Sequence, residues 1–203
     1  MICGIDEAGR GPLAGPVFAA AVILGPAFSP ILLNDSKKLT PARRERAEAA
    51  IRAGASAWGI GWASHEEIDA VNILRASLLA MKRAVEELLK AAAERGLTED
   101  LEAIVDGLYT PDITIPCRAM VKADARIPEV MAASILAKTA RDREMTRYAL
   151  LYPGYGYERH KGYPTKAHRQ AIARLGPSPI QRLSFTVTYE ADIPGAAACS
   201  CYR

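Results

Sequence analysis

Residues 4–16 read Gly-Ile-Asp-Glu-Ala-Gly-Arg-Gly-Pro-Leu-Ala-Gly-Pro, and the chain is organised around them. Two adjacent carboxylates, Asp6 and Glu7, end a short apolar run. A glycine-flanked arginine, Arg10, follows, and then a second apolar run from Val17 to Leu24. Glycines let backbone N–H groups approach a partner closely, so acidic ligands beside such a loop are typical of a metal and phosphate site. By itself the stretch is also explained by a hairpin with charges at its turn, the commoner case for an isolated Asp-Glu pair.

The composition indicates one soluble domain. A chain of 203 residues is long enough to bury a full core. Its formal charge of +3 is too small to indicate a nucleic-acid partner. Between residues 141 and 182, however, nine Lys and Arg face three acids, which suits either a phosphate backbone or a solvated helix face. The four cysteines have neither zinc nor disulfide spacing, and no apolar run is long enough to span a bilayer, so we expect a cytoplasmic protein.

Alternating and helical apolar patterns predict an α/β protein. The predicted strands are 1–6, 16–24, 57–63, 103–106 and a last one that follows residue 117 and ends at 123–125. The predicted helices are 41–52, 65–71, 73–93, 128–151 and 166–175. The first two strands are expected to form a hairpin.

Three aspartates, Asp6, Asp106 and Asp124, each end a predicted strand. In open α/β sheets, ligands gather beyond the carboxyl ends of the strands. A single Asp after a strand is usually a cap or a turn former, but three of them with an adjacent Glu indicate a shared acidic site. Because side chains alternate along a strand, we expect Asp6 at the sheet edge and Glu7 in the following loop.

Three other polar features each have two explanations. Lys37 and Lys38 occupy a turn ahead of a helix and are either solvated or in contact with phosphate. Lys138 and Asp142 lie four residues apart on one helix face, so they either pair or contribute to a site. The stretch 152–168 interleaves aromatic rings with cations and glycines, a pattern that suits stacking on bases or sugars and contact with phosphates.

Six motifs follow one another between the first residues and about Phe185. They are Gly4-Ile5-Asp6-Glu7-Ala8-Gly9-Arg10-Gly11-Pro12, Asp35-Ser36-Lys37, Val105-Asp106-Gly107, Lys122-Ala123-Asp124, Ala132-Ala133-Ser134-Ile135-Leu136-Ala137-Lys138 and Lys161-Gly162-Tyr163-Pro164-Thr165. Together, and in this order, they closely resemble the type 2 ribonuclease H family, bacterial ribonuclease HII.

The resemblance implies a ribonuclease H-like fold, with a mixed five-stranded sheet flanked by helices and a C-terminal helical segment. It divides the chain into a catalytic domain (1–150), a substrate-gripping segment of the same domain (151–187) and a tail (188–203). The implied activity is hydrolysis of the RNA strand of RNA–DNA hybrids and incision 5′ of single ribonucleotides in duplex DNA, leaving 3′-OH and 5′-phosphate ends. A monomer without a membrane partner is expected.

The resemblance also implies roles for individual residues. The metal-binding, catalytic carboxylates should be Asp6, Glu7, Asp106 and Asp124. The loop Gly9-Arg10-Gly11 should read the ribose 2′-OH through its backbone, and Tyr163 should pack against the sugar 3′ of the ribonucleotide. The phosphate contacts, or supports of the acidic cluster, should be Ser36, Lys37 and Lys138. Two Mg²⁺ or Mn²⁺ ions about 4 Å apart would activate water and relieve charge on the leaving oxygen.

Four departures from the family pattern concern the surroundings of Asp124 and the substrate grip. Ala123 stands where the family usually has glycine, and Pro164 replaces the commoner glycine after the tyrosine. The runs 126–130 and 181–185 match only in part. No carboxylate is lost.

Two alternative functions remain at this stage. A junction-resolvase type of nuclease on the same fold would share the acidic cluster without needing the 2′-OH. A non-catalytic nucleic-acid-binding domain would explain the basic C-terminal third, but not four carboxylates.

Overall fold

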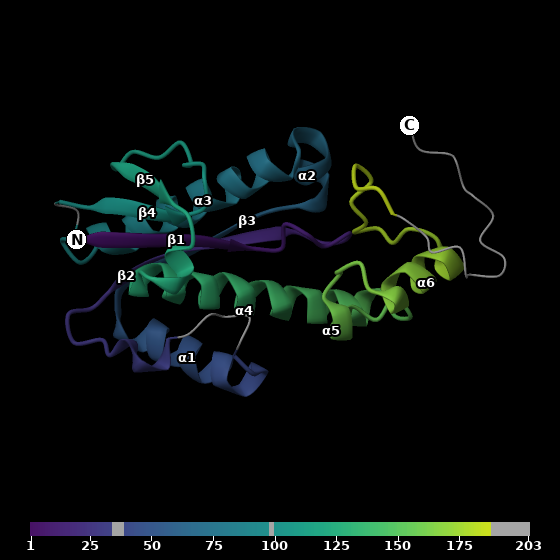
Figure 1. Cartoon of the computed structure of the whole chain (residues 1–203), viewed down its shortest axis with the longest axis horizontal. Coiled ribbons are helices and arrows are strands. Elements are labelled where there is room, and N and C mark those ends of the chain that lie inside the picture. Colours follow the sequence, from purple (N-terminus) through teal and green to yellow (C-terminus); the bar gives the residue numbers. More distant parts are fainter. Residues whose placement is uncertain (34–38, 98–99, 188–203) are drawn as a thin grey trace.

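The computed structural model describes residues 1–33, 39–97 and 100–187. A five-stranded sheet forms its centre (Figure 1). The strands are β1 (Ile2–Ala8), β2 (Val17–Leu24), β3 (Ala55–Ala63), β4 (Glu102–Asp106) and β5 (Cys117–Met120). The helices are η1 (Pro30–Leu32), α1 (Pro41–Gly54), α2 (His65–Val71), α3 (Ile73–Ala93), η2 (Ala123–Ala125), α4 (Pro128–Leu151), α5 (Tyr157–His160) and α6 (Lys166–Leu175).

The sheet is mixed, as predicted, with the strand order β3-β2-β1-β4-β5. β1 pairs antiparallel with β2 in the expected hairpin, and β2 pairs antiparallel with β3. On its other side β1 pairs parallel with β4, which in turn pairs parallel with β5. The first strand of the chain is therefore the middle strand of the sheet, and its carboxyl end lies beside that of β4.

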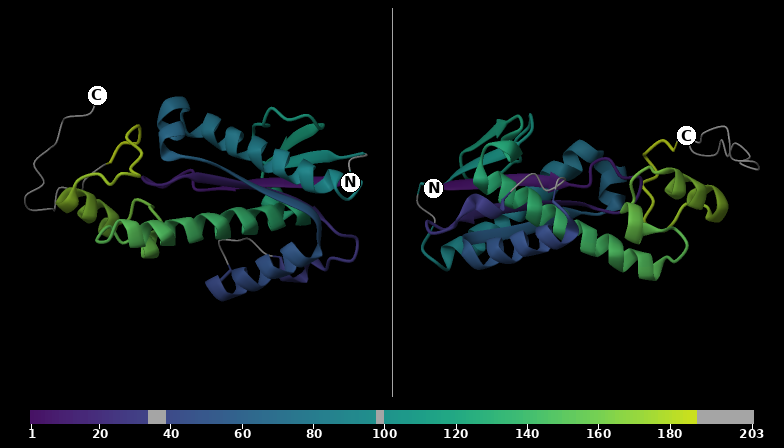
Figure 2. Two further views of the ribbon diagram at one scale, coloured as in Figure 1. Left: turned by 180° about the vertical axis from the view of Figure 1, so that it is seen from behind. Right: turned by 60° about the horizontal axis from the view of Figure 1, so that its bottom comes forward.

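Helices cover both faces of the sheet. α3 packs on β1, β2 and β3 from one side, whereas α4 packs on β1 and β2 from the other and carries α1 on its outer surface (Figures 1 and 2). Alternate residues of β1 point to opposite faces of the sheet. Cys3 and Ile5 belong to the apolar core under α3. Gly4 and Asp6 face α4.

Gly4 explains how closely α4 approaches the sheet. A Cβ atom at this position would lie only 2.2 Å from the carbonyl carbon of Glu129 and 2.3 Å from the nitrogen of Val130, both in the first turn of α4. Glycine is thus required because backbone meets backbone here. This contact brings the start of α4, and the short η2 turn just before it, next to Asp6.

The long helices lie where the sequence predicts them, while two strand ends differ. β1 continues past Asp6 to Ala8, because Glu7 and Ala8 still pair with residues of β2. β5 ends at Met120, and the residues 123–125 form η2 instead of strand. Lys122, which precedes η2, has a left-handed backbone with φ of 59°, and this conformation cannot continue a strand.

The C-terminal segment packs on the loop that joins β1 to β2. The N–H of Leu13 donates to the carbonyl of Gly162 at 2.8 Å, and Ala14 forms an isolated antiparallel bridge with Gln181. The stretch predicted to be irregular contains the one-turn helix α5. The division of the chain into a catalytic domain (1–150) and a substrate-gripping segment (151–187) remains a prediction. The expected tail (188–203) lies outside the described residues. Within the described ranges, no helix is both long and apolar enough to cross a bilayer.

Candidate active site

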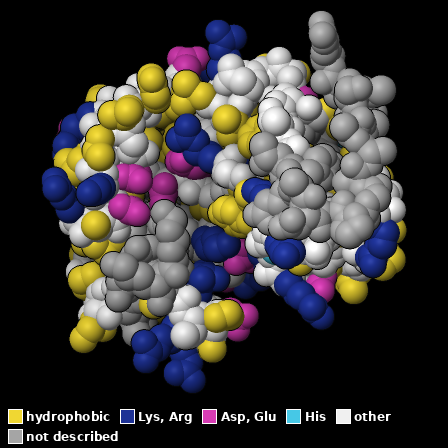
Figure 3. Space-filling model, turned by 45° about the vertical axis from the view of Figure 1, so that its right-hand side comes forward, with side chains coloured by type: hydrophobic (Ala, Val, Ile, Leu, Met, Phe, Trp, Pro, Cys, Tyr) yellow, Lys and Arg dark blue, Asp and Glu magenta, His cyan; other side chains and the backbone are white. Residues whose placement is uncertain are grey.

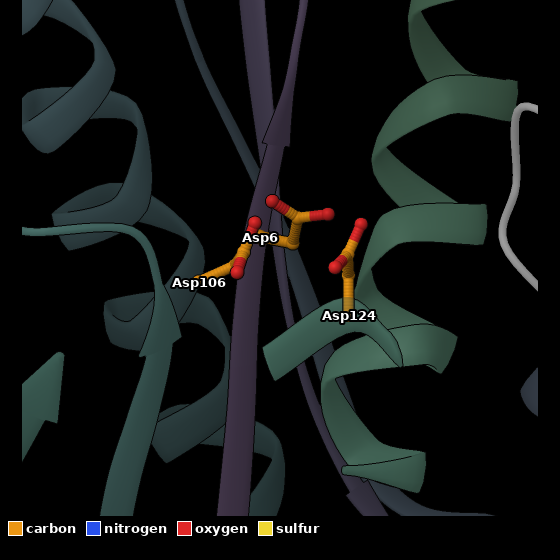
Figure 4. A group of neighbouring side chains, drawn as sticks. All are labelled: Asp6, Asp106 and Asp124. Carbon is orange, nitrogen blue, oxygen red and sulfur yellow. The ribbon is translucent and has the colours of Figure 1, made fainter. Parts of the chain in front are cut away.

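Three carboxylates converge beyond the ends of β1 and β4. Asp6 lies near the end of β1, Asp106 is the last residue of β4, and Asp124 belongs to η2 (Figure 4). One oxygen from each lies within 4.8 Å of the others. The parallel pairing explains the first two, because Ile5 and Val105 are partners and the aspartates follow them directly.

Asp124 reaches this cluster from a helical turn, so the prediction that it ends a strand is wrong. The left-handed Lys122 turns the chain back, and the N–H of Ala123 then donates to an oxygen of Asp106 at 2.8 Å. Ala123 itself is completely buried between the sheet and α4. The alanine found in place of the family's usual glycine therefore fits the turn, since the positive φ belongs to the residue before it.

The cluster is electrostatically costly without a cation. Asp6 has only 6% of its surface exposed, and burial followed by the charge of Glu7 raises its pKa well above the usual value. Hydrogen bonds from Ser134 and from the Glu7 N–H lower the pKa in part. Closely spaced carboxylate oxygens are the hard ligands that Mg²⁺ and Mn²⁺ prefer. The donor set thus fits a divalent metal.

Glu7 occupies a different position from the one expected. It lies within β1 rather than in the following loop, and its charge raises the pKa of the neighbouring Asp6. It still borders the same cavity, and burial raises its pKa, while an ion pair at 3.3 Å with Arg10 opposes that shift. The cluster of three excludes it, so its role as a fourth ligand remains a prediction.

A cavity of about 210 Å³ opens over the carboxylates. The residues that line it include all the predicted site residues within the described ranges except Asp124: they are Asp6, Glu7, Gly9, Arg10, Gly11, Asp106, Lys138 and Tyr163, together with Ala8 and Ser134. Figure 3 shows acidic side chains gathered on one part of a face, with Lys and Arg side chains close by. Ser36 and Lys37, like Lys38, lie outside the described residues.

Tyr163 lies next to the glycine loop and lines the same cavity. Its ring comes so close to Gly11 that a Cβ there would lie 3.7 Å from the ring carbon Cε1. The Tyr163 backbone is held on both sides, because its N–H donates to the His160 carbonyl at 2.9 Å and its own carbonyl contacts Nδ1 of His168 at 3.0 Å. The ring is 39% exposed, which leaves it accessible to a ligand.

Lys138 borders the cavity but is also paired. Its ammonium group lies 2.7 Å from Asp142, whose other oxygen accepts from Arg44 at 3.2 Å. The helix-face pairing is thus confirmed, and a phosphate contact by Lys138 remains a prediction. Ser134, one turn earlier, hydrogen-bonds Asp6. The sequence placed it on the same face as Lys138, yet that spacing alone did not indicate its contact.

Two arginines of the basic C-terminal third are not on the surface. Arg141 and Arg182 are completely buried, so they do not contribute to a basic face. Their guanidinium groups donate to backbone carbonyls of the loop between β1 and β2. Nothing in the spacing of charges distinguished these two from their solvated neighbours, because arginine is seldom buried.

The sheet order is that of a ribonuclease H-like fold, and the carboxylate cluster fits a divalent metal of the kind that nucleases use. In comparisons with known proteins, the family model for ribonuclease HII matches residues 3–188. Over 197 residues the chain is 55% identical to ribonuclease HII of Treponema denticola, an alignment that covers 92% of this chain and 98% of the relative. The chain therefore belongs to the ribonuclease HII family and is a ribonuclease H enzyme, an endoribonuclease that acts on RNA–DNA hybrids.

Solved structures support the same fold. The ribonuclease H2 of Pyrococcus horikoshii superposes with a TM-score of 0.67 at 24% identity, covering 92% of this chain and 94% of that one. Bst-RNase HIII, solved in complex with Mn²⁺, gives a TM-score of 0.70 at 21% identity, covering 85% of this chain and 60% of that one. At these identities the likeness establishes the fold, which is the one predicted.

Proposed function

We propose that the enzyme, besides cutting hybrids, incises duplex DNA on the 5′ side of single embedded ribonucleotides. The observation that carries this proposal is the placement of a glycine-rich backbone and an exposed aromatic ring around one carboxylate cluster. Gly9, Arg10 and Gly11 line the same cavity as Tyr163, Asp6 and Asp106. A single 2′-OH is the only group that distinguishes an isolated ribonucleotide from its DNA neighbours.

In this proposal, different residues bind the sugar, the metal ions and the flanking phosphates. The N–H groups of the Gly9–Gly11 loop approach the ribose and bind the 2′-OH, while Tyr163 packs on the neighbouring sugar. The carboxylates Asp6, Asp106 and Asp124, with Glu7, hold two divalent cations. When bound, these cations activate water and stabilise charge on the phosphate and the leaving oxygen. Lys138 and the segment around Ser36 and Lys37 hold flanking phosphates.

The proposed reaction is the hydrolysis of one phosphodiester bond. The oxygen of water forms a bond to phosphorus as the bond between phosphorus and the 3′ oxygen of the preceding nucleotide breaks. One water proton ends on that 3′ oxygen, and the other leaves to solvent. The products are a 3′-OH and a 5′-phosphate on the ribonucleotide. The proposal includes a monomeric, cytoplasmic enzyme that uses Mg²⁺ or Mn²⁺.

Matched duplexes with one, four or no ribonucleotides test the proposal in Mg²⁺ and in Mn²⁺. We expect cutting of the first two and not of the third, with the single cut directly 5′ of the ribonucleotide. Cutting of the all-DNA duplex or of a DNA junction would support a resolvase instead, and binding without cutting would support a non-catalytic domain.

Tyr163→Ala tests the contact with the sugar, and Tyr163→Phe is its control because it retains the ring. We expect the alanine variant to lose roughly tenfold or more in kcat/KM on the one-ribonucleotide duplex, as one base- or sugar-stacking contact contributes about 1–3 kcal/mol. The loss on the four-ribonucleotide duplex should be smaller. An equal loss on both substrates would make Tyr163 merely structural.

A further inference from the structure

Arg182 holds the loop between β1 and β2 from inside the protein. It follows α6 in the C-terminal segment, it is completely buried, and its guanidinium group donates to five different backbone carbonyls. These acceptors are the carbonyls of Gly9 (2.6 Å), Pro12 (2.8 Å), Gly15 (2.8 Å), Arg10 (3.0 Å) and Pro16 (3.2 Å). One side chain therefore sets the course of the whole loop.

Two of these bonds fix the direction of the N–H groups that line the cavity. The carbonyl of Gly9 and the N–H of Arg10 belong to one peptide group, as do the carbonyl of Arg10 and the N–H of Gly11. Peptide groups are planar, and those of the residues that the structure describes are trans, so the C=O and N–H of each point in opposite directions. Because Arg182 draws both carbonyls inward, the N–H groups of Arg10 and Gly11 turn outward. Both residues line the active-site cavity.

Arg141 of α4 completes the arrangement. Its guanidinium group donates to the carbonyls of Pro16 at 3.0 Å, Ala14 at 3.3 Å and Lys161 at 3.0 Å. It also passes so close to Gly9 that a Cβ atom there would lie 2.1 Å from Nε. The Lys161 contact ties the loop to the segment that carries Tyr163. We call Arg141 and Arg182 the arginine clamp.

The chemistry of the clamp argues for positioning rather than for stability. Every hydrogen bond that the structure gives these two side chains ends on a backbone carbonyl, and none ends on a carboxylate. Burial lowers the pKa of both groups, and the charge of Arg141 lowers that of Arg182 further, yet both remain protonated at neutral pH. Apolar side chains would fill such a space at less cost. Only a planar fork with five donors can hold several carbonyls at once.

We propose that the arginine clamp positions the Arg10 and Gly11 N–H groups for recognition of the ribose 2′-OH. Arg182 is the main positioning residue, and Arg141 is its support. Neither touches the substrate. This inference rests on the proposed incision at single ribonucleotides, because it assigns the geometry of the loop that reads the hydroxyl.

The test replaces each clamp arginine by lysine, which keeps the charge but has three donors on one nitrogen and cannot reproduce the fork. Arg182→Lys and Arg141→Lys are compared with Arg95→Lys, a matched control at an exposed arginine that also donates to a backbone carbonyl, that of Ser56 at 2.7 Å. Three quantities are measured: kcat/KM on the one-ribonucleotide duplex, Kd for the all-DNA duplex, and the thermal unfolding midpoint. All rates are expressed per folded molecule.

We expect roughly a 10- to 100-fold fall in kcat/KM for Arg182→Lys and a smaller fall for Arg141→Lys, since a displacement of about 1 Å at a reacting centre costs up to 100-fold. Kd for all-DNA duplex should change by less than about twofold, and Arg95→Lys should match the wild type. A folded Arg182→Lys enzyme with wild-type kcat/KM would overturn the proposal. So would an equal loss in kcat/KM and in all-DNA affinity, because that would show a general structural defect.

A measurement on the wild type guards against variants that fail to fold. The clamp requires the Arg10 and Gly11 amides to be rigid before substrate binds, with NMR order parameters near 0.85, and values below about 0.6 would contradict it. The two proposals fail separately. If the wild type does not cut at a single ribonucleotide, the proposed function is wrong. If it does but the clamp variants cut equally well, only the clamp is wrong.

Discussion

The molecule contains two groups of like charges on either side of one loop. Asp6, Asp106 and Asp124 cluster beyond the ends of β1 and β4, the first two lining the cavity, while Arg141 and Arg182 lie buried against the Gly9–Gly15 loop. The carboxylates border a cavity that solvent and ions can enter, so their repulsion can be relieved by a bound cation. The guanidinium groups are buried, and all their hydrogen bonds in the described residues go to backbone carbonyls. The first group has the donor atoms that a divalent cation prefers, and the second holds the backbone of the neighbouring loop.

The comparison also explains why the loop is rich in glycine. On its inner side the loop lies within hydrogen-bonding distance of two guanidinium groups, and on its outer side Gly9, Arg10 and Gly11 line the cavity. A side chain at Gly9 would meet Arg141, and one at Gly15 would lie 2.4 Å from the sulfur of Met145. Glycine at position 9 therefore makes room for Arg141, and glycine at position 15 makes room for Met145.

The largest effect should come from breaking the acidic group. Asp106→Asn should reduce cleavage of an RNA–DNA hybrid in Mg²⁺ by roughly 10³-fold, because weakening the metal site removes about 4 kcal/mol of transition-state stabilisation. Thermal unfolding of the metal-free variant should occur no lower than that of the wild type, since one of three repelling charges is gone. Asp112→Asn, at an exposed aspartate, is the control. Cleavage at the normal rate would refute the assignment.

The second-largest effect should come from disturbing the contact between Gly9 of the loop and Arg141 of the arginine clamp. Gly9 has φ of 105°, and a Cβ there would collide with Arg141, so Gly9→Ala should lower the free energy of unfolding by about 2 kcal/mol. Gly96→Ala is the matched control, because Gly96 also has a positive φ but has no atom within 4 Å of the added Cβ. Urea denaturation measures both. Equal costs would show that backbone strain alone, and not the Arg141 contact, makes glycine necessary at position 9.

Stabilisation by Mg²⁺ should depend on the aspartate cluster and not on the arginine clamp. Adding Mg²⁺ to several times its Kd should stabilise the metal-free enzyme by about 1 kcal/mol, a rise in Tm of roughly 2–4 °C. Asp106→Asn should show a smaller rise at the same concentration. The arginine-clamp variants should retain the full rise, and its loss there would mean that the two charged groups do not act separately.

The smallest effect involves two histidines that hold the Tyr163 segment. His160 and His168 stack with ring centroids 4.4 Å apart, and burial, followed by the charge of His160, lowers the pKa of His168 to about 4. In the unfolded chain the pKa of His168 is near 6.5. As the pH falls, the unfolded chain therefore becomes protonated at a higher pH than the folded protein. Stability from this group is therefore complete above pH 6.5 and is lost between pH 6.5 and 4.

The measurement is Tm as a function of pH for the wild type and for His168→Gln. Between pH 6.5 and 4 the Tm of the wild type should fall further than that of the variant. The difference between the two curves isolates this group from the carboxylates, which titrate in the same range. Parallel curves would show that His168 is not held neutral in the folded state.

Local signals in the sequence predicted most of the helices correctly. Thr40 and Thr165, residue types that favour the N-cap position, cap their helices with side chains that accept from N–H groups three residues later. The boundaries of α3 and α4 follow from apolar spacing and from Pro128 at a first helical position. Such signals act within a few residues, which is why they can be read without knowledge of the fold.

Strand ends and the η2 turn could not be predicted as well, because they depend on partners far along the chain. Asp6 does not end β1, since β2 offers pairing partners for two further residues. Asp124 reaches the cluster only because Lys122 reverses the chain and Gly4 admits the start of α4. The residue types of the acidic site were evident, but the geometry that joins them was not.

By itself the sequence indicated which residue types the candidate site contains: three aspartates and a glutamate, a glycine loop around Arg10, and a tyrosine among cations. It also indicated where most helices lie. The tertiary structure alone decided which of these meet. Parallel pairing places Asp6 beside Asp106 from strands about 100 residues apart in the chain. Packing of the C-terminal segment turns Arg182 from an apparent surface cation into the support of the loop. The reason is physical: capping and periodicity are local, whereas burial and charge neutralisation exist only once distant segments are packed together.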